Sequence, residues 1–247
     1  MSVSFDRVAE IFDETRGMPP EPMKKAVETL VKELNGYKRI LDAGVGTGRY
    51  AKPLQDSGFE VVGIDIARKM LGKAIDKGVH NLFLSDACNL AFRDSSFDAA
   101  LSFGVLHLIS EWKTALREIT RVTSKVLISM VHRHRNPIRE AYNESMKRQG
   151  HEFRKVGIGE IELAEFVKPR KTIQAACYNV HADKTLEFIE DKAYSHQWNV
   201  PDSLHKQAMS EIRDKFIGKV YAQATDILMW DVKDLKAYLR SSETTLV

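Results

Sequence analysis

Three glycines at alternating positions form the most distinctive cluster of this sequence. Gly44, Gly46 and Gly48 stand in the run DAGVGTG, which begins at Asp42. Such a loop lets the backbone turn tightly and approach a ligand, because no Cβ atoms stand in the way. The helical pattern that follows offers unpaired backbone N–H groups to polar ligand atoms. The run therefore predicts a site in which the backbone itself contacts a ligand.

An acidic residue further along the chain narrows the class of ligand. Asp65 ends a second apolar run, 17 residues after Gly48. In a sheet built from strand, glycine loop and helix, a carboxylate at this place can accept hydrogen bonds from both hydroxyls of a ribose. The alternative is a structural turn beside an ordinary surface carboxylate. The spacing favours a ribose-containing ligand.

The elements expected to position these residues alternate between apolar strands and amphipathic helices. Strands are predicted at Lys38–Ala43, Phe59–Ile64, Asn81–Leu84, Phe97–Phe103 and Lys125–Val131. Helices are predicted at Gly46–Ser57, Ala67–Lys77 and Trp112–Val122. Near-continuous apolar strands alternating with helices indicate a parallel sheet that is covered on both faces.

The second half of the chain departs from this alternation. Helical patterns cover Pro137–Gln149, Glu160–Val167 and residues 183–217, while Thr172–Val180 and Gly218–Val232 have strand patterns. Two late strands separated by a helical insertion predict a β-hairpin with an enlarged connection. We therefore expect an α/β fold, with a doubly wound, seven-stranded, mostly parallel sheet, an antiparallel edge hairpin, N-terminal helices and a small helical cap insertion.

The glycine run and its context resemble the class I S-adenosylmethionine-dependent methyltransferases, whose first motif is D/E-x-G-x-G-x-G. Asp42 to Gly48 matches that motif at every fixed position. The resemblance covers about residues 5 to 130 and extends to residues 160 to 235. It implies that S-adenosyl-L-methionine is the cofactor. It also implies cofactor contacts for the backbone of Gly44, Gly46 and Gly48, a loop-ordering or water-ordering role for Asp42, and the ribose role for Asp65.

Three further landmarks extend this implied site. After the third predicted strand, Asp86 would receive the adenine amine, and the backbone of Ala87 would meet a ring nitrogen. Ile66 follows the ribose carboxylate and belongs to the same cofactor site. Phe103, at the exit of the fourth strand, would line the sulfonium end. For Asp86 the alternative is a helix N-cap or loop residue.

The resemblance also implies a domain organisation. We expect one methyltransferase domain over residues 1–247, with a cofactor-binding core at 37–131. Residues 1–36 would form an N-terminal helical lid over the cofactor, or simply cap the sheet. Residues 132–160 and 183–219 would form a helical substrate cap.

No catalytic base follows from the sequence. A sulfonium-bound methyl group is already electrophilic, so the protein must chiefly position the acceptor and exclude water. His107 is a candidate for the substrate side of the site, although a packed or capping histidine is an equal alternative.

The region after the fifth predicted strand is basic. His132, Arg133, His134, Arg135 and Arg139 could hold an anionic substrate, although a solvated loop is the more ordinary interpretation of such a run. Residues 131–171 contain ten Lys or Arg and six Glu. Aromatic residues lie among them, as in proteins that bind single-stranded RNA. The aromatic wall of a pocket, or simple core packing, is expected from Tyr178, Tyr194, His196 and Trp198.

The leading hypothesis is methyl transfer to a small-molecule acceptor. A tRNA or rRNA methyltransferase and a non-catalytic, partner-binding subunit are alternatives. A nicotinamide dehydrogenase is disfavoured, because its fingerprint places a glycine where this sequence has Arg49.

Composition limits which other partners, metal sites and cellular locations are expected. A net charge of +3 permits a nucleic acid partner without demanding one. Cys88 and Cys177 are far apart and lack metal-ligand spacing, so neither a disulfide nor a metal site is expected. Without a long apolar run or a signal peptide pattern, we expect a cytoplasmic protein with no membrane partner. Its oligomeric state does not follow from the sequence.

Overall fold

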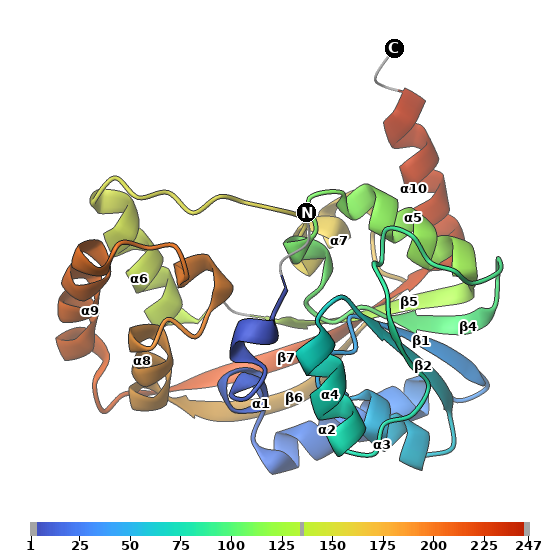
Figure 1. The fold of residues 1–247 in the computed structure, drawn as a ribbon, viewed down its shortest axis with the longest axis horizontal. Helices are drawn as coiled ribbons and strands as arrows, with labels where there is room; N and C mark the ends of the chain where they lie inside the picture. The colour runs from blue at the N-terminus through green and yellow to red at the C-terminus, as the bar shows by residue number, and fades with distance from the viewer. Residues whose placement is uncertain (1–3, 134–135, 245–247) are drawn as a thin grey trace. The chain divides into compact units, whose positions relative to one another are not determined.

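The computed structural model describes residues 4–133 and 136–244. The described strands form one seven-stranded sheet in the order β3-β2-β1-β4-β5-β7-β6 (Figure 1). The strands are β1 Arg39–Ala43, β2 Glu60–Asp65, β3 Leu82–Leu84, β4 Phe97–Leu101, β5 Thr123–His132, β6 Lys171–His181 and β7 Val220–Asp231.

Strand β1 lies between β2 and β4, and both pairs are parallel. Asp42 pairs with Gly63 of β2 and with Leu101 of β4, so the carboxyl ends of the three strands share one edge. The β5-β7-β6 edge is antiparallel. The predicted mostly parallel α/β sheet with an antiparallel edge is therefore confirmed. Its shared edge is where open α/β sheets bind ligands.

Helices alternate with the strands along the chain, and most of them lie where the sequence pattern predicts. They are α1 Phe12–Arg16, α2 Pro20–Glu33, α3 Ala51–Asp56, α4 Arg68–Asp76, α5 Trp112–Val122, α6 Pro137–Arg148, α7 Glu160–Phe166, α8 Ala182–Glu190, α9 Asp202–Phe216 and α10 Val232–Thr244. Short 3-10 turns are η1 Asp6–Val8, η2 Leu106–Leu108 and η3 Ser195–Gln197. The helix predicted from Gly46 begins only at Ala51, because glycines with positive φ keep the preceding loop out of helical geometry.

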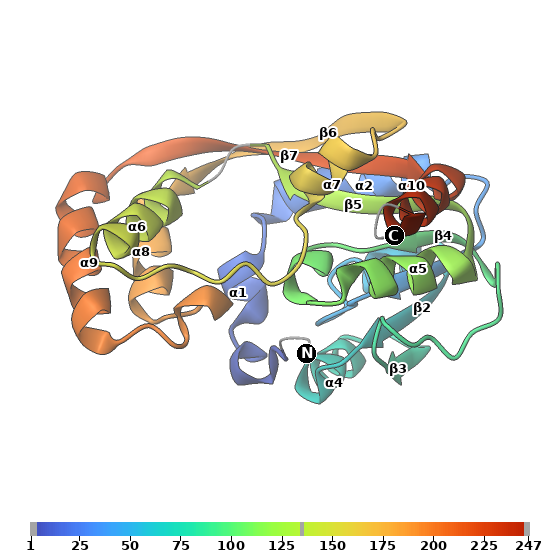
Figure 2. The ribbon, with the colours of Figure 1, turned by 90° about the horizontal axis from the view of Figure 1, so that it is seen from above.

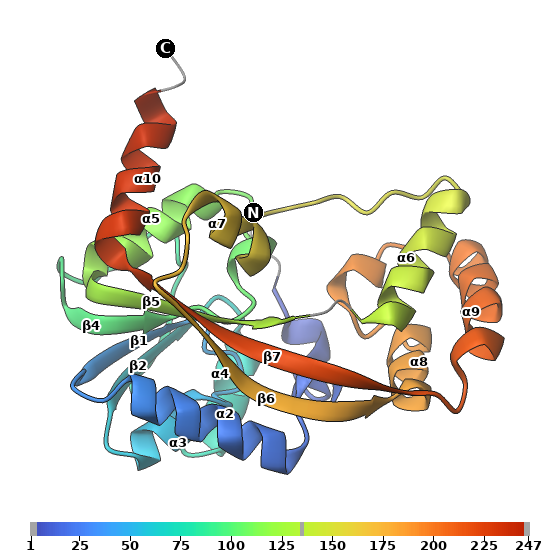
Figure 3. The ribbon, with the colours of Figure 1, turned by 180° about the vertical axis from the view of Figure 1, so that it is seen from behind.

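The two faces of the sheet bury different helices. On one face, α2 and α3 contribute Leu30 and Leu54 to a core shared with β1 (Figure 3). On the other, α5 and α10 contribute Leu116 and Leu235 (Figure 2). The indole of Trp230, fully buried in β7, donates to the carbonyl of Val167 at 2.7 Å. These two cores hold the carboxyl edge of the strands in place.

Helix α10 is a feature that the sequence analysis did not predict. It follows β7 directly at Val232, and its apolar residues Leu235 and Leu239 are buried against the sheet. Their spacing of four residues is a helical signal, but it covers too short a stretch to stand out beside the long β7 pattern.

The chain divides into two compact units. The first unit contains residues 1–131, 156–175 and 226–247, and the second contains residues 132–155 and 176–225. In the second unit α6, α8 and α9 lie side by side (Figure 1) around a core of their own. That core includes the fully buried Tyr142 and Met146 of α6. Among the described helices, none is long and apolar enough to cross a membrane.

Candidate functional site

The glycine loop bends sharply at the end of β1. Gly44, Gly46 and Gly48 have φ angles of 81°, 56° and 73°, in the left-handed region. The N–H groups of Gly44 and Val45 both donate to the carbonyl of Ile64, at 2.8 and 2.9 Å. Glycine is the residue that adopts these angles at low cost. The sequence at Asp42–Gly48 therefore fixes a tight loop that is tied to the end of β2.

Close packing inside the protein also requires two of these glycines. A Cβ atom built at Gly44 would lie 2.3 Å from Val105 Cγ2, and one at Gly48 would lie 2.5 Å from Val79 Cγ2. At Gly46 the nearest atom is the terminal methyl carbon of Met70, at 3.3 Å. Among these three glycines, Gly46 is therefore the one at which packing within the protein gives the weakest reason for the absence of a side chain.

Asp65 ends β2 and holds this loop. Its Oδ2 accepts the N–H of Gly46 at 2.9 Å, and its Oδ1 accepts the N–H of Ala67 at 2.8 Å. Burial raises the pKa of Asp65, and the backbone donors partly offset that rise. A carboxylate has about four lone-pair sites, so two remain for a ligand after these two bonds.

Asp42 is a buried carboxyl group near the end of β1. Its side chain is 3% exposed, and no donor among the described residues bonds to it. Burial, followed by the negative charge of Asp65, raises the pKa of Asp42 to about 7. A buried carboxylate without a donor is costly, which suggests that a cationic ligand group completes it.

The predicted adenine end of the site lies after β2 and β3. Asp65 pairs with Leu84 across these strands. Ile66 is 42% exposed and Leu84 is 50% exposed, so two large apolar side chains face solvent at this edge. Asp86 is exposed, and its Oδ1 accepts the N–H of Cys88 in a local turn, whereas Ala87 is buried. The adenine role of Asp86 and Ala87 remains a prediction.

The exit of β4 leads past the glycine loop. Phe103 packs edge-on against Tyr50 with ring centroids 4.7 Å apart. His107 lies in η2 with an exposed side chain, and its carbonyl accepts the N–H of Gly157 at 3.1 Å. Val105 fills the space over Gly44. The turn from Phe103 to His107 is therefore packed directly on the loop, and the substrate-side role of His107 remains a prediction.

Sequence reasoning missed an acidic residue at the same edge. Glu160, the first residue of α7, accepts the N–H of Gly104 at 3.1 Å and the hydroxyl of Ser129 at 3.4 Å. Burial raises its pKa. Beside it, a cavity of about 10 Å³ adjoins Ser102, whose buried hydroxyl has no partner among the described residues. Glu160 is 56 residues from Gly104, so no local motif marks it.

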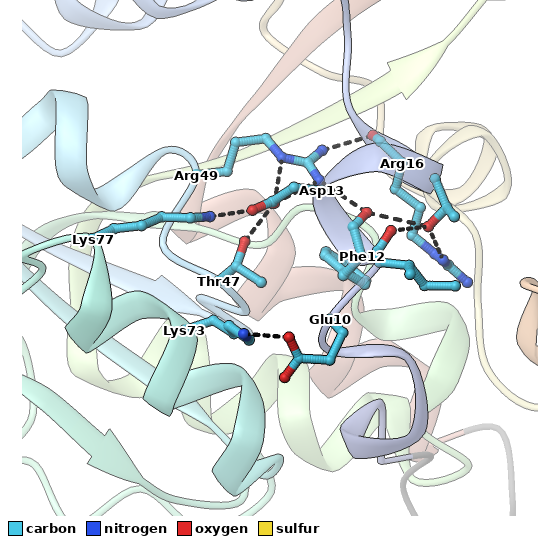
Figure 4. A network of polar contacts seen from close by, with 10 residues as sticks. Glu10, Phe12, Asp13, Arg16, Thr47, Arg49, Lys73 and Lys77 are labelled. Carbon is cyan, nitrogen blue, oxygen red and sulfur yellow. Dashed lines mark hydrogen bonds and ion pairs between the residues drawn. The ribbon is translucent and has the colours of Figure 1, made fainter.

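The N-terminal segment from Phe5 to Arg16 lies on the glycine loop and α4 (Figure 4). Asp13 accepts the hydroxyl of Thr47 at 2.6 Å and pairs with Arg49 at 3.1 Å and with Lys77. Although burial acts to raise the pKa of Asp13, bonds from Lys77 and Thr47 and the charge of Arg49 lower it. This network attaches the segment to the C-terminal end of the loop and to the C-terminal end of α4.

The same segment also contacts the start of α4 and forms a second bond with the guanidinium of Arg49. The N–H of Lys69 donates to Asp6 Oδ1 at 2.7 Å, and Lys73 pairs with Glu10. Arg49 also donates to the carbonyl of Arg16 at 2.6 Å (Figure 4). The segment therefore covers the loop in this structure, and its function as a lid remains a prediction.

The basic and aromatic candidates after β5 fall in the second unit. His132 Nδ1 lies 3.0 Å from the hydroxyl of Thr225. Arg133 donates its N–H to the carbonyl of Ala224 at 2.9 Å, while His134 and Arg135 lie outside the described residues. Tyr194 stacks on His196, and Tyr178 and Trp198 are half-buried.

Comparison with known proteins agrees with this geometry. Residues 41–126 match a family of methyltransferase domains. The chain is 34% identical over 158 residues to the demethylmenaquinone methyltransferase of Renibacterium salmoninarum, covering 60% of this chain and 66% of that protein. It is 30% identical over 149 residues to the phosphatidylethanolamine N-methyltransferase of Cereibacter sphaeroides, covering 56% of this chain and 71% of that protein.

A third relative acts on RNA by its name, and a solved structure shares the fold. The tRNA (carboxymethyluridine(34)-5-O)-methyltransferase of Arabidopsis thaliana is 36% identical over 121 residues, covering 48% of this chain and 28% of that protein. A Thermotoga maritima structure, described as a methyltransferase and possible histamine N-methyltransferase, is 16% identical with a TM-score of 0.54, covering 91% of this chain and 97% of that one.

The chain therefore belongs to the class I S-adenosylmethionine-dependent methyltransferases, a family of enzymes whose cofactor is S-adenosyl-L-methionine. It spans 66%, 50% and 56% of the length of three demethylmenaquinone methyltransferases that it matches. The residues at the carboxyl edge fit that cofactor, because the donorless Asp42, the open lone pairs of Asp65 and the bare backbone at Gly46 are all complementary to its polar groups.

Proposed function

We propose that this protein transfers the methyl group of S-adenosyl-L-methionine to a small-molecule acceptor. The observation that carries the proposal is the pair of carboxylates Asp42 and Asp65 at one sheet edge. Asp42 is buried without a donor from the described residues, and Asp65 keeps acceptor capacity beyond its two backbone bonds. The cofactor offers an ammonium group and ribose hydroxyls, which are the matching donors.

Each residue then has a distinct part in holding the cofactor. Asp42 accepts the ammonium group, and this cation offsets the cost of the buried charge. Asp65 accepts the ribose hydroxyls while it keeps Gly46 in place. Ile66 provides an apolar surface for the purine, and Asp86 accepts its amine. The two aspartates contribute most of the polar binding free energy, because charge-assisted hydrogen bonds are stronger than neutral ones.

For methyl transfer, the protein must chiefly position the two reactants. When bound, the cofactor supplies a methyl group that is electrophilic because it is attached to a sulfonium. The turn from Phe103 to His107 packs on the glycine loop and helps to exclude water from this end of the site. The N-terminal segment from Phe5 to Arg16 covers the other side of the loop. No protein base is required for a nucleophile that is already neutral and basic.

A small-molecule acceptor is favoured by the relatives. The curated relatives with the longest matches include a demethylmenaquinone methyltransferase and a phosphatidylethanolamine N-methyltransferase, whose names specify small acceptors. The second candidate function is RNA methylation. It is supported by the tRNA methyltransferase relative and by the excess of Lys and Arg over Glu in residues 131–171.

Calorimetric titration tests the cofactor site. We expect S-adenosylmethionine and S-adenosylhomocysteine to bind the intact protein. Asp65→Ala should weaken the affinity by about 1 to 3 kcal/mol, the scale of hydrogen bonds to a charged group. Asp76→Ala removes an exposed carboxylate of α4 and is the matched control, with an affinity within about twofold of the parent. Equal affinities for the parent protein and a folded Asp65→Ala variant would remove the ribose assignment.

Incubation with isotopically labelled cofactor tests the acceptor. The protein is supplied with a metabolite extract in one arm and with total RNA in the other, and labelled products are detected by mass spectrometry. A small-molecule reaction labels the first arm alone. Label in the RNA arm, together with RNA affinity that falls steeply with salt, supports the second candidate. Cofactor binding with no label in either arm would favour a non-catalytic subunit.

A further inference from the structure

Arg139 of the second unit is an arginine held on the face of an aromatic ring. Its Cζ atom lies 4.3 Å from the centroid of the Tyr194 ring, and Tyr194 is only 8% exposed. Asn136 caps α6, and its Oδ1 accepts the N–H of Arg139 at 3.1 Å. The backbone under the side chain and the ring beneath the guanidinium are therefore both fixed, which orients the group before any ligand binds.

The charge of this arginine lacks a protein partner in the part of the chain that the structure describes. Within those residues no carboxylate forms an ion pair with Arg139 and no acceptor bonds to its guanidinium. Two other arginines that lie over rings differ in this respect. Arg49, over Phe12 at 5.6 Å, pairs with Asp13, and Arg39, over Phe97 at 5.4 Å, pairs with Glu60.

The groups around Arg139 are polar or cationic. Burial, followed by the positive charge of Arg139, lowers the pKa of His132. Tyr221 receives a hydrogen bond from the Asn136 amide at 2.7 Å, and burial raises its pKa while the charge of Arg139 opposes that rise. The positive charge of Arg139 therefore acts on both titrating neighbours.

We propose that Arg139 is the anchor of an oxyanion-binding site in the second unit, which takes the carboxylate or phosphate group of a small molecule. A guanidinium placed over a ring keeps N–H donors for other partners, and its planar donor pair matches two oxygens of a carboxylate or phosphate. The ring contact also reduces the entropy lost when the donors are ordered.

Only one part of this proposal depends on the proposed function: that the bound anion is a group of the methyl acceptor. Partly exposed aromatic side chains next to Tyr194 are suited to the apolar body of such a molecule. His196 is stacked on Tyr194 with ring centroids 6.1 Å apart, and Phe153 meets His196 edge-on at 4.9 Å. An acceptor with an acidic group on an apolar or aromatic frame is the class that this surface fits.

Nuclear magnetic resonance of the full chain, labelled at arginine, tests the site without turnover. The Nε–H signal of Arg139 is identified as the one missing from Arg139→Gln. It is then followed during titrations with inorganic phosphate and with sodium benzoate, at constant ionic strength. We expect a saturable shift with at least one probe and at least a tenfold weaker affinity in Arg139→Lys, which keeps the charge but loses the planar donor pair.

Arg154→Gln is the matched control, because Arg154 is an exposed arginine of the same unit, and its variant should bind the probes as the parent does. Saturation by benzoate alone identifies a carboxylate site, and saturation by phosphate alone identifies a phosphate site. A shift of Arg139 that never saturates, or equal affinities for the parent and Arg139→Lys, would overturn the proposal. Calorimetry with S-adenosylhomocysteine on the same samples separates this result from the cofactor site, because anion binding without cofactor binding would overturn the proposed function alone.

Discussion

The two units differ in how their polar groups are assembled. At the carboxyl edge of the first unit, Asp42 and the glycine loop are neighbours in sequence, and Asp65 follows within 19 residues of Gly46. In the second unit, the buried hydroxyl of Tyr142 bonds to His205, 63 residues away, at 2.7 Å, and His205 reaches the carbonyl of Glu190 at 3.0 Å. The first arrangement leaves a short pattern in the sequence, whereas the second leaves none.

Asp42 and the Tyr142–His205 pair also differ in whether the protein satisfies them. Asp42 lacks a donor among the described residues, and its pKa is raised to about 7. The Tyr142–His205 pair is closed by a backbone carbonyl and has a structural character. Groups left unsatisfied by the protein indicate ligand sites, whereas satisfied networks indicate packing. This contrast leads to predictions that separate stability from ligand affinity in each unit.

The largest expected effect is that of Gly44→Ala. The new Cβ atom would meet Val105 at 2.3 Å, at a φ of +81°. Overpacking and backbone strain together should destabilise the protein by about 4 kcal/mol and abolish cofactor binding. Gly36→Ala has a φ of +86° but open space around the new methyl group, so it should cost only about 1 kcal/mol. Chemical denaturation of both variants measures the difference, and similar losses would show that crowding by Val105 is unimportant.

Asp42→Asn should stabilise the protein, whereas Gly44→Ala destabilises it. Between about pH 4 and pH 7 the folded protein keeps a proton on Asp42 that the unfolded chain has lost, so this group makes stability fall as the pH rises. The Asp42→Asn variant removes this dependence of stability on pH. Relative to the parent, its stability gain should grow from near zero at pH 4 to about 4 kcal/mol at pH 8, while its cofactor affinity falls.

Denaturation at a series of pH values, with calorimetry on the same samples, checks both parts of the Asp42 prediction. Asp76→Asn is the control for loss of an exposed carboxylate. A stability difference between parent and Asp42→Asn that does not change with pH would show that Asp42 is not an uncompensated buried acid.

The smallest effect tests the second unit. Tyr142→Phe removes the hydroxyl that bonds to His205 and should destabilise the protein by about 1 to 2 kcal/mol, because a buried ring nitrogen loses its partner. Cofactor affinity should stay within about twofold. Tyr37→Phe, whose hydroxyl accepts an exposed bond from Arg170, is the matched control with a smaller loss. A large loss of cofactor affinity in Tyr142→Phe would contradict the structural assignment.

The sequence predicted the order of the elements because each one carries its own periodic signal. The helix Trp112–Val122 was predicted at the bounds that the structure gives, and the late strands were found around a helical insertion. The start of α3 was placed too early, since periodicity alone cannot tell a glycine loop from a first helical turn. Helix α10 was missed because its signal is short and adjoins the apolar run of β7.

The chemistry of the site was less accessible to sequence reasoning. The motif marks Asp42 and Asp65, but the lack of a donor for Asp42 depends on the packing of several elements. Glu160 meets Gly104 across 56 residues, and Arg139 meets Tyr194 across a comparable stretch of chain. Such contacts follow from tertiary structure, which no local pattern encodes.

A crystal structure with S-adenosylhomocysteine tests the roles of Asp42 and Asp65. We expect the ribose hydroxyls to lie within hydrogen-bonding distance of the Asp65 carboxylate, and the amino group to lie within hydrogen-bonding distance of Asp42. Clear density for the compound at the glycine loop, with its sugar away from Asp65 and its amino group away from Asp42, would show that these two carboxylates do not hold the cofactor.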